Sequence, residues 1–140
     1  MKKLHVLQIA ALMVVMLGLT GCLLFFLDNS IDTVKFFVDG EEFTEELLEL
    51  QPGDEVNITI EVLTGRGQKM TNCIVSWTID HTQGRIFGYL DRTDGYQVVF
   101  TAVEDVQETV YGALEVTAES PMDGEVVSGR LRIKVEPQNL

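Results

Sequence analysis

The first 27 residues constrain this chain more than any other stretch, because they are almost wholly apolar and contain no acidic residue. Met1-Lys2-Lys3 is a short positive segment, and the apolar run of residues 4–19 is broken only by His5, Gln8 and Gly18. A positive segment followed by an apolar segment that ends in small residues is typical of a secretory signal. The sequence therefore predicts that the remaining residues are exported across a membrane.

The last residues of this run, Leu19-Thr20-Gly21-Cys22, resemble the lipobox of bacterial lipoproteins. The resemblance implies that residues 1–21 are a lipoprotein signal peptide and that Cys22 becomes the mature N-terminus, with acyl chains on its sulfur and amine. Two or more acyl chains hold a protein stably at a bilayer, whereas one does not. We therefore expect residues 22–31 to be a lipidated cysteine with a short tether, and the lipid bilayer to be a partner through Cys22.

An uncleaved anchor would explain the same residues, because Leu23-Leu24-Phe25-Phe26-Leu27 continues the apolar run. As one helix, residues 4–27 would be about 36 Å long, enough to cross a hydrocarbon core of about 30 Å. Lys2 and Lys3 would then stay in the cytoplasm. Both alternatives predict a membrane-anchored, extracytoplasmic location in the cell envelope. In a Gram-negative cell the residue after the cysteine, Leu23, resembles the default signal for the outer membrane; otherwise the cell membrane is expected.

The charge of the chain excludes one class of partner. Its 140 residues have a net charge of −12. Without Lys2 and Lys3 the exported part has eight bases and 22 acids, a net charge of −14. Such a surface repels nucleic acid, so no nucleic-acid partner is expected. The only cysteine besides Cys22 is Cys73, so no intrachain disulfide is expected, and Cys73 is interpreted as a small buried apolar residue.

Beyond the tether the hydrophobic pattern has a period of two. Apolar and polar residues alternate in segments near residues 34–38, 56–62, 73–79, 96–102, 110–118 and 127–135, with a short apolar piece at 86–90. Turn residues such as Asp39-Gly40, Gln51-Pro52-Gly53 and Asp94-Gly95 separate them. About seven short strands at regular spacing predict an all-β antiparallel sandwich over residues 32–140. Residues 41–50 fit either a helical spacing or a short strand at Leu48-Glu49-Leu50.

Several of these segments are similar to bacterial Ig-like domains. They are Val75-Ser76-Trp77, Thr93-Asp94-Gly95 leading into residues 98–102, and the segments 112–118 and 128–135. The resemblance implies an Ig-like β-sandwich preceded by a hydrophobic signal or anchor helix. Trp77, the single tryptophan, lies on the apolar side of its strand and is expected at the centre of the core. The last two strands should form a hairpin in which Glu115 and Glu119 face Arg130, Arg132 and Lys134.

The exported part offers few groups for catalysis or metal binding. Its only histidine is His81, which follows Asp80 and has no nucleophile with a family signature around it, so a solvated loop residue is expected. Five loop acids could hold calcium but are interpreted as solvated: Asp91, Asp94, Glu104, Asp105 and Asp123. No catalytic residue, metal site or cofactor is predicted.

The sequence favours a non-catalytic binding or structural module of the bacterial cell envelope, with an envelope protein or glycan as its partner. The alternative is an accessory subunit of an envelope transport or assembly complex, anchored by an uncleaved N-terminal transmembrane helix. A lipid-anchored hydrolase would need a catalytic pair, and the sequence shows none.

Overall fold

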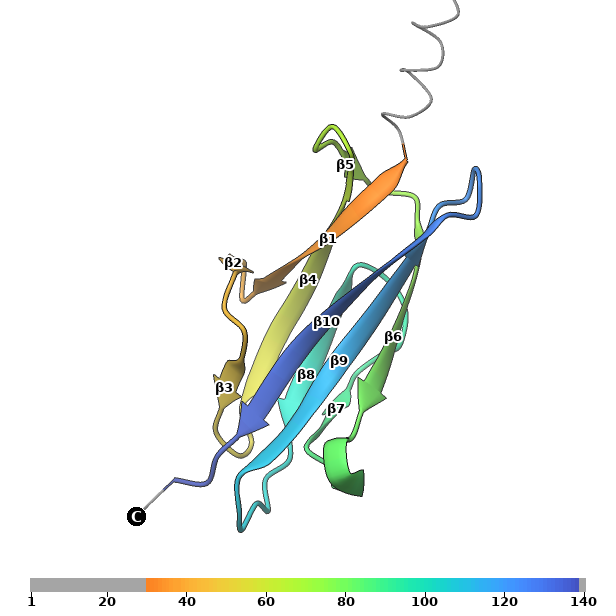
Figure 1. Ribbon diagram of the computed structural model, residues 1–140. Coiled ribbons are helices and arrows are strands. Elements are labelled where there is room, and N and C mark those ends of the chain that lie inside the picture. The colour runs from red at the N-terminus through yellow and green to blue at the C-terminus, as the bar shows by residue number, and fades with distance from the viewer. Residues whose placement is uncertain (1–29, 139–140) are drawn as a thin grey trace, which may run out of the picture.

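Residues 30–138 are described by a computed structural model, in which two β-sheets pack face to face (Figure 1). The six-stranded sheet has the order β2-β1-β4-β8-β7, with β5 paired to β4, and the four-stranded sheet has the order β3-β10-β9-β6. The strands are β1 (Ile31–Val38), β2 (Glu41–Phe43), β3 (Leu48–Leu50), β4 (Glu55–Thr64), β5 (Lys69–Met70), β6 (Ile74–Asp80), β7 (Gly88–Leu90), β8 (Gln97–Ala102), β9 (Val110–Glu119) and β10 (Val126–Val135). One short 3-10 helix, η1 (Thr82–Gly84), precedes β7.

The strand order is that of an immunoglobulin-type sandwich. When the short strands β2, β3 and β5 are set aside, the sheets read β1-β4-β8-β7 and β10-β9-β6. These orders correspond to strands ABED and GFC of the constant-type immunoglobulin fold. The predicted all-β sandwich of about seven strands is therefore confirmed. The predicted signal or anchor helix and Cys22 lie outside the described residues, and no helix within residues 30–138 is long and apolar enough to span a membrane.

The alternation of apolar and polar residues explains why these segments become strands. In β4 the residues Val56, Ile58, Ile60 and Val62 are all buried, while the residues between them face outward. Successive side chains of a strand point to opposite faces, so one apolar row per strand is enough to build the space between the sheets.

Trp77 lies in that space, as predicted. Its side chain is 2% exposed. The indole N–H donates a hydrogen bond to the carbonyl oxygen of Gly95 at 2.8 Å, and the ring meets Phe36 edge to face, with 6.3 Å between centroids. The polar atom of the largest core side chain is thus paired inside the core, which avoids the penalty of burying an unsatisfied donor.

Residues 41–50 form two short strands, each in a different sheet. Asp39 and Gly40 both have positive φ, 49° and 87°, which is the type I′ hairpin geometry that returns the chain as β2 beside β1. The chain then crosses to the other sheet, where β3 pairs in parallel with β10. The strand alternative at Leu48–Leu50 is therefore correct, and the helical spacing of this stretch has no helical counterpart.

Tyr96 ties the segment before β6 to β8. Its hydroxyl donates to the carbonyl oxygen of Met70 at 2.9 Å and accepts a hydrogen bond from the backbone N–H of Cys73 at 3.0 Å. Burial, together with the neighbouring Cys73, raises the pKa of Tyr96 to about 12. One side chain thus binds two main-chain groups, one in the last residue of β5 and one in the residue just before β6.

Replacing Tyr96 with phenylalanine should lower the free energy of unfolding by about 1–3 kcal/mol, because two backbone groups lose their partner. The pKa of Tyr96 rises from 10.0 to about 12 on folding. The contribution of the protonated hydroxyl to the free energy of unfolding is therefore complete below pH 10 and is lost as the pH rises toward 12. Urea unfolding of wild type and Tyr96→Phe across this range checks the prediction. The difference between the two proteins should shrink as the pH rises, and a constant difference would contradict it.

Candidate functional site

The two ends of the sandwich differ in what surrounds them (Figure 1). At one end, named here the leader end, lie Ser30, the loop of residues 65–68 and the β9–β10 turn of residues 120–125. At the opposite end, named the far end, lie η1, the loop of residues 103–109 and the last residue of β10. The large hydrophobic side chains that the described part exposes divide between these ends: Ile74, Met122 and Val126 at the leader end, and Ile86, Tyr89 and Tyr111 at the far end.

The far end has an open depression of about 480 Å³ between two segments of the chain. Its lining is mainly apolar and comes from residues on either side of β7 and β8: Arg85, Ile86, Val103, Asp105, Val106, Gln107, Glu108 and Val110. An ion pair of 3.0 Å joins Arg85 and Glu108 across the two segments. The hollow combines apolar side chains with three charged ones, Arg85, Asp105 and Glu108, and exposed apolar surface of this kind can bind a partner.

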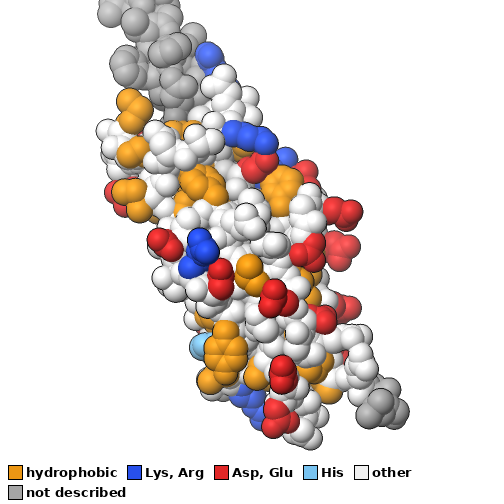
Figure 2. Space-filling model, turned by 180° about the vertical axis from the view of Figure 1, so that it is seen from behind, with side chains coloured by type: hydrophobic (Ala, Val, Ile, Leu, Met, Phe, Trp, Pro, Cys, Tyr) orange, Lys and Arg blue, Asp and Glu red, His pale blue; other side chains and the backbone are white. Residues whose placement is uncertain are grey.

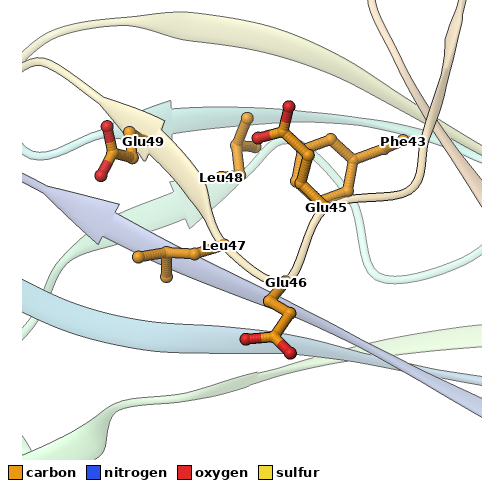
Figure 3. A pocket seen from close by; sticks show the side chains of 6 residues that line it. All are labelled: Phe43, Glu45, Glu46, Leu47, Leu48 and Glu49. Carbon is orange, nitrogen blue, oxygen red and sulfur yellow. The ribbon is translucent and has the colours of Figure 1, made fainter.

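A second depression, of about 550 Å³, lies in the link between β2 and β3. All of its lining comes from one short segment, Phe43 to Glu49, and the carboxylates of Glu45, Glu46 and Glu49 point in different directions (Figure 3). It is therefore a bend of the chain rather than a cleft between elements. Acidic side chains also gather along this edge of the molecule, at the right of Figure 2, where β2, β3 and the link expose five glutamates: Glu41, Glu42, Glu45, Glu46 and Glu49.

The predicted charge pairing of the last hairpin is confirmed at one position. Arg130 lies opposite Glu115 in the β9–β10 register and forms an ion pair with it. It also reaches Asp80 on β6, at 2.6 Å. The hydrogen bond with Asp80, followed by the charges of Asp80 and Glu115, raises the pKa of Arg130. One guanidinium therefore links three neighbouring strands on the outer face of the four-stranded sheet.

The other predicted pairs of this hairpin do not form across it. Arg132 lies opposite Ala113, and Lys134 lies opposite Tyr111. Lys134 instead pairs with Glu136 at 2.8 Å and with Glu49 at 3.3 Å. Glu119 lies opposite Val126. The register explains the difference, because only Arg130 has an acid directly across the pair.

Reversing the charge of Arg130 should therefore weaken the sheet more than the same change at Arg132. In Arg130→Glu three acids would meet on one face, whereas Arg132→Glu places its new charge opposite Ala113. Exposed pairs are screened by salt, so we expect a modestly lower melting temperature for Arg130→Glu in low salt, with the difference shrinking in high salt. Equal melting temperatures of the two variants in low salt would contradict this role.

The candidate catalytic residue His81 is exposed, as predicted. Its ring lies edge-on to Phe87, with 5.5 Å between centroids. The neighbouring carboxylate of Asp80 is directed to Arg130, so it does not orient the imidazole. His81 is accordingly part of the far-end surface, and the carboxylate next to it in sequence is engaged by Arg130 instead of supporting general-base chemistry.

The five candidate calcium ligands do not gather in one place. Asp91 accepts a hydrogen bond from the backbone N–H of Val99 at 2.7 Å, and this bond lowers the pKa of Asp91. Asp123 accepts one from the backbone N–H of Glu125, which likewise lowers the pKa of Asp123. Glu104 and Asp105 lie at the far end, and Asp94 forms a bridge beside Ser76. Within residues 30–138 no group of three such side chains could hold a metal ion.

Of the two cysteines, only Cys73 is described. It is a free, half-buried thiol packed against the hydrophobic core, so the predicted apolar role holds, whereas the predicted burial is only partial. Cys22, the predicted lipidation site, lies outside the described residues.

The exposed apolar residues were missed as candidate binding residues. Ile74 and Tyr111 each occupy a position of the polar row of their strand, and Met122 lies in a polar turn. An apolar residue at a position where the pattern expects a polar one was the sequence signal that could have identified them as exposed. What the sequence could not show is that they divide between the two ends of the sandwich.

No family model and no curated protein matches this chain. Among solved structures it is similar to domains 4 and 5 of the S-layer protein SbsC, with 12% identity and a TM-score of 0.47 over 76% of this chain and 53% of that one. The chain thus spans about half the length of that structure. A chimeric titin Z1Z2 carrying a decorin peptide matches at 14% identity and a TM-score of 0.39, over 66% of this chain and 89% of that one. Titin M4 matches at 10% identity and a TM-score of 0.38, over 72% of this chain and 95% of that one. The fold assignment rests on the strand order itself.

Proposed function

We propose that this protein is a membrane-anchored, extracytoplasmic Ig-like domain that acts as a non-catalytic binding or structural module of the bacterial cell envelope. The observation that carries the proposal is Leu19-Thr20-Gly21-Cys22 at the end of the apolar run, directly before the domain. An acylated Cys22 would hold the leader end toward the bilayer. The far end would then face away from it and present its apolar depression to an envelope protein or glycan.

The arrangement of the domain supports anchoring at the leader end and partner binding at the far end. β1 begins at Ile31, and β10 ends at the opposite end of the sandwich (Figure 1). The far-end depression is assembled from two segments and has more apolar character than the bend between β2 and β3. Partners bind preferentially to apolar surface that a domain leaves exposed, so Ile86, Tyr89 and Tyr111 are the residues proposed to contact one.

A second candidate is an accessory subunit of an envelope transport or assembly complex, anchored by an uncleaved transmembrane helix. The apolar residues 23–27 favour it, because lipoproteins usually have a polar tether after the cysteine and this chain does not. Residues 4–27 are long enough for the purpose. In this case a larger complex should co-purify with the protein in fixed stoichiometry.

The intact mass of the protein extracted from membranes decides between the two anchors. A chain that begins at Cys22 and carries acyl mass, together with a Cys22→Ala variant that is neither acylated nor cleaved, supports the lipoprotein. A full-length chain without acyl mass, unchanged by Cys22→Ala, supports the transmembrane helix. A cleaved chain without acyl mass that is recovered free of membranes would contradict both.

A further inference from the structure

The leader end exposes three large apolar side chains to solvent. Met122 in the β9–β10 turn is 87% exposed, Ile74 is 64% exposed and Val126 is 58% exposed. Ile74 and Val126 both lie opposite Glu119 in the sheet register, so they occupy one row across β6, β9 and β10. Met122 follows in the turn that leaves this row. These three residues are named here the leader-end patch.

The patch lies at the end of the sandwich where β1 begins, and hydrophobic side chains are visible there at the upper left of Figure 2. The chain before β1 limits how far this end can be from a membrane. Seven residues lie between Cys22 and Ser30, so Ser30 is eight steps along the chain, and even a fully extended chain spans at most about 3.3–3.6 Å per residue. The leader end must therefore remain within roughly 30 Å of an anchored Cys22.

We propose that the leader-end patch contacts the lipid surface in which the protein is anchored, with Met122 inserted at the boundary between headgroups and acyl chains and with Ile74 and Val126 resting against the headgroups. The inference depends on the proposed membrane anchoring and adds an orientation to it. A tethered apolar group meets the bilayer at high effective concentration, so a small patch is enough to bias the domain toward one orientation. The contact would hold the far end outward, where a partner can reach it.

The distribution of charge agrees with this contact. The leader end carries both signs of charge. Arg66 lies in the loop before β5 and Lys69 in β5, while Glu119, Asp123 and Glu125 lie around the β9–β10 turn. The densest run of acids, in residues 41–49, lies on β2, β3 and their link, away from the leader end (Figures 1 and 2). Anionic headgroups would repel that acidic edge. The contact is therefore apolar in character and should form on zwitterionic lipid.

The membrane-anchored protein, purified from membranes with its anchor and reconstituted into phosphatidylcholine vesicles with brominated acyl chains, tests the proposal. Met122→Trp places a fluorophore in the patch, and Tyr111→Trp places one on the same sheet at the far end. Bromine quenches tryptophan on contact, and Trp77 is buried in both variants. We expect several-fold stronger quenching in Met122→Trp than in Tyr111→Trp, relative to unbrominated vesicles. Equal quenching, or none, would overturn the proposal.

Because tryptophan itself favours membrane interfaces, a second variant combines Met122→Trp with Ile74→Ser and Val126→Ser. Its quenching should fall clearly below that of Met122→Trp alone, and unchanged quenching would overturn the role of the patch. Vesicle flotation and intact mass are recorded in parallel. Protein that floats with the vesicles without quenching at position 122 refutes the contact and leaves the anchor intact. Protein that does not float refutes both.

Discussion

Replacing Trp77 with alanine is expected to lower the free energy of unfolding by about 3–5 kcal/mol, a large part of the stability of a domain this size. The change would empty the space that the indole fills between the sheets and remove its contact with Phe36. It would also leave the carbonyl oxygen of Gly95 without the donor that it now has. Urea unfolding followed by circular dichroism measures the effect without relying on tryptophan fluorescence.

Trp77→Phe is the matched control, because it keeps an aromatic ring and removes the indole N–H. We expect its free energy of unfolding to lie between those of wild type and Trp77→Ala, because phenylalanine retains part of the side-chain volume of tryptophan. If Trp77→Ala unfolded at the same urea concentration as wild type, Trp77 would not be the centre of the core.

Replacing Gly112 with alanine should have the second large effect. A Cβ atom at this position would lie 2.0–2.4 Å from the ring of Phe87, which is itself fully buried. The ring packs at a tilt of 34° against Phe100, with 5.4 Å between centroids, and cannot move aside freely. Overpacking of this kind typically costs about 1–3 kcal/mol, and more where the neighbours are rigid. Thermal unfolding should show a clearly lower melting temperature.

Gly65→Ala provides the control for the substitution itself. A Cβ at Gly65 would meet nothing within 4 Å, so its melting temperature should stay close to that of wild type. Adding Phe87→Leu to Gly112→Ala should recover part of the loss, because a smaller side chain makes room for the methyl group. Equal melting temperatures for Gly112→Ala and Gly65→Ala would show that the Phe87 ring can yield.

These two sites explain how the sandwich can hold together with Cys73 as a free thiol. Antibody domains join their sheets by a disulfide against a buried tryptophan. Here Trp77 and Phe36 occupy one part of the core, and Phe87 and Phe100 occupy another. Aromatic pairs add specific geometry to the burial of apolar area, so both halves of the core are fixed by packing.

For the longer strands, local sequence was enough to predict both the strand itself and the side that faces the core, whereas the short strands β2 and β5 were not predicted. The alternation in β4 and the placing of Trp77 could be predicted, because side-chain direction in a strand repeats every two residues and depends only on local order. The Asp39-Gly40 turn was equally local, since few residue types accept positive φ.

Which distant segments meet depends on the packing of the whole domain. The pairing of β3 with β10 joins Leu48–Leu50 to the last strand of the domain, and nothing in either segment specifies the other. The position of Arg130 between Glu115 and Asp80 depends on β6, which follows the register of β9 rather than any pattern near Arg130. The same holds for the separation of the exposed apolar residues into two ends. Residues far apart in sequence become neighbours through the packing of whole sheets, and hydrophobic pattern carries no information about that choice.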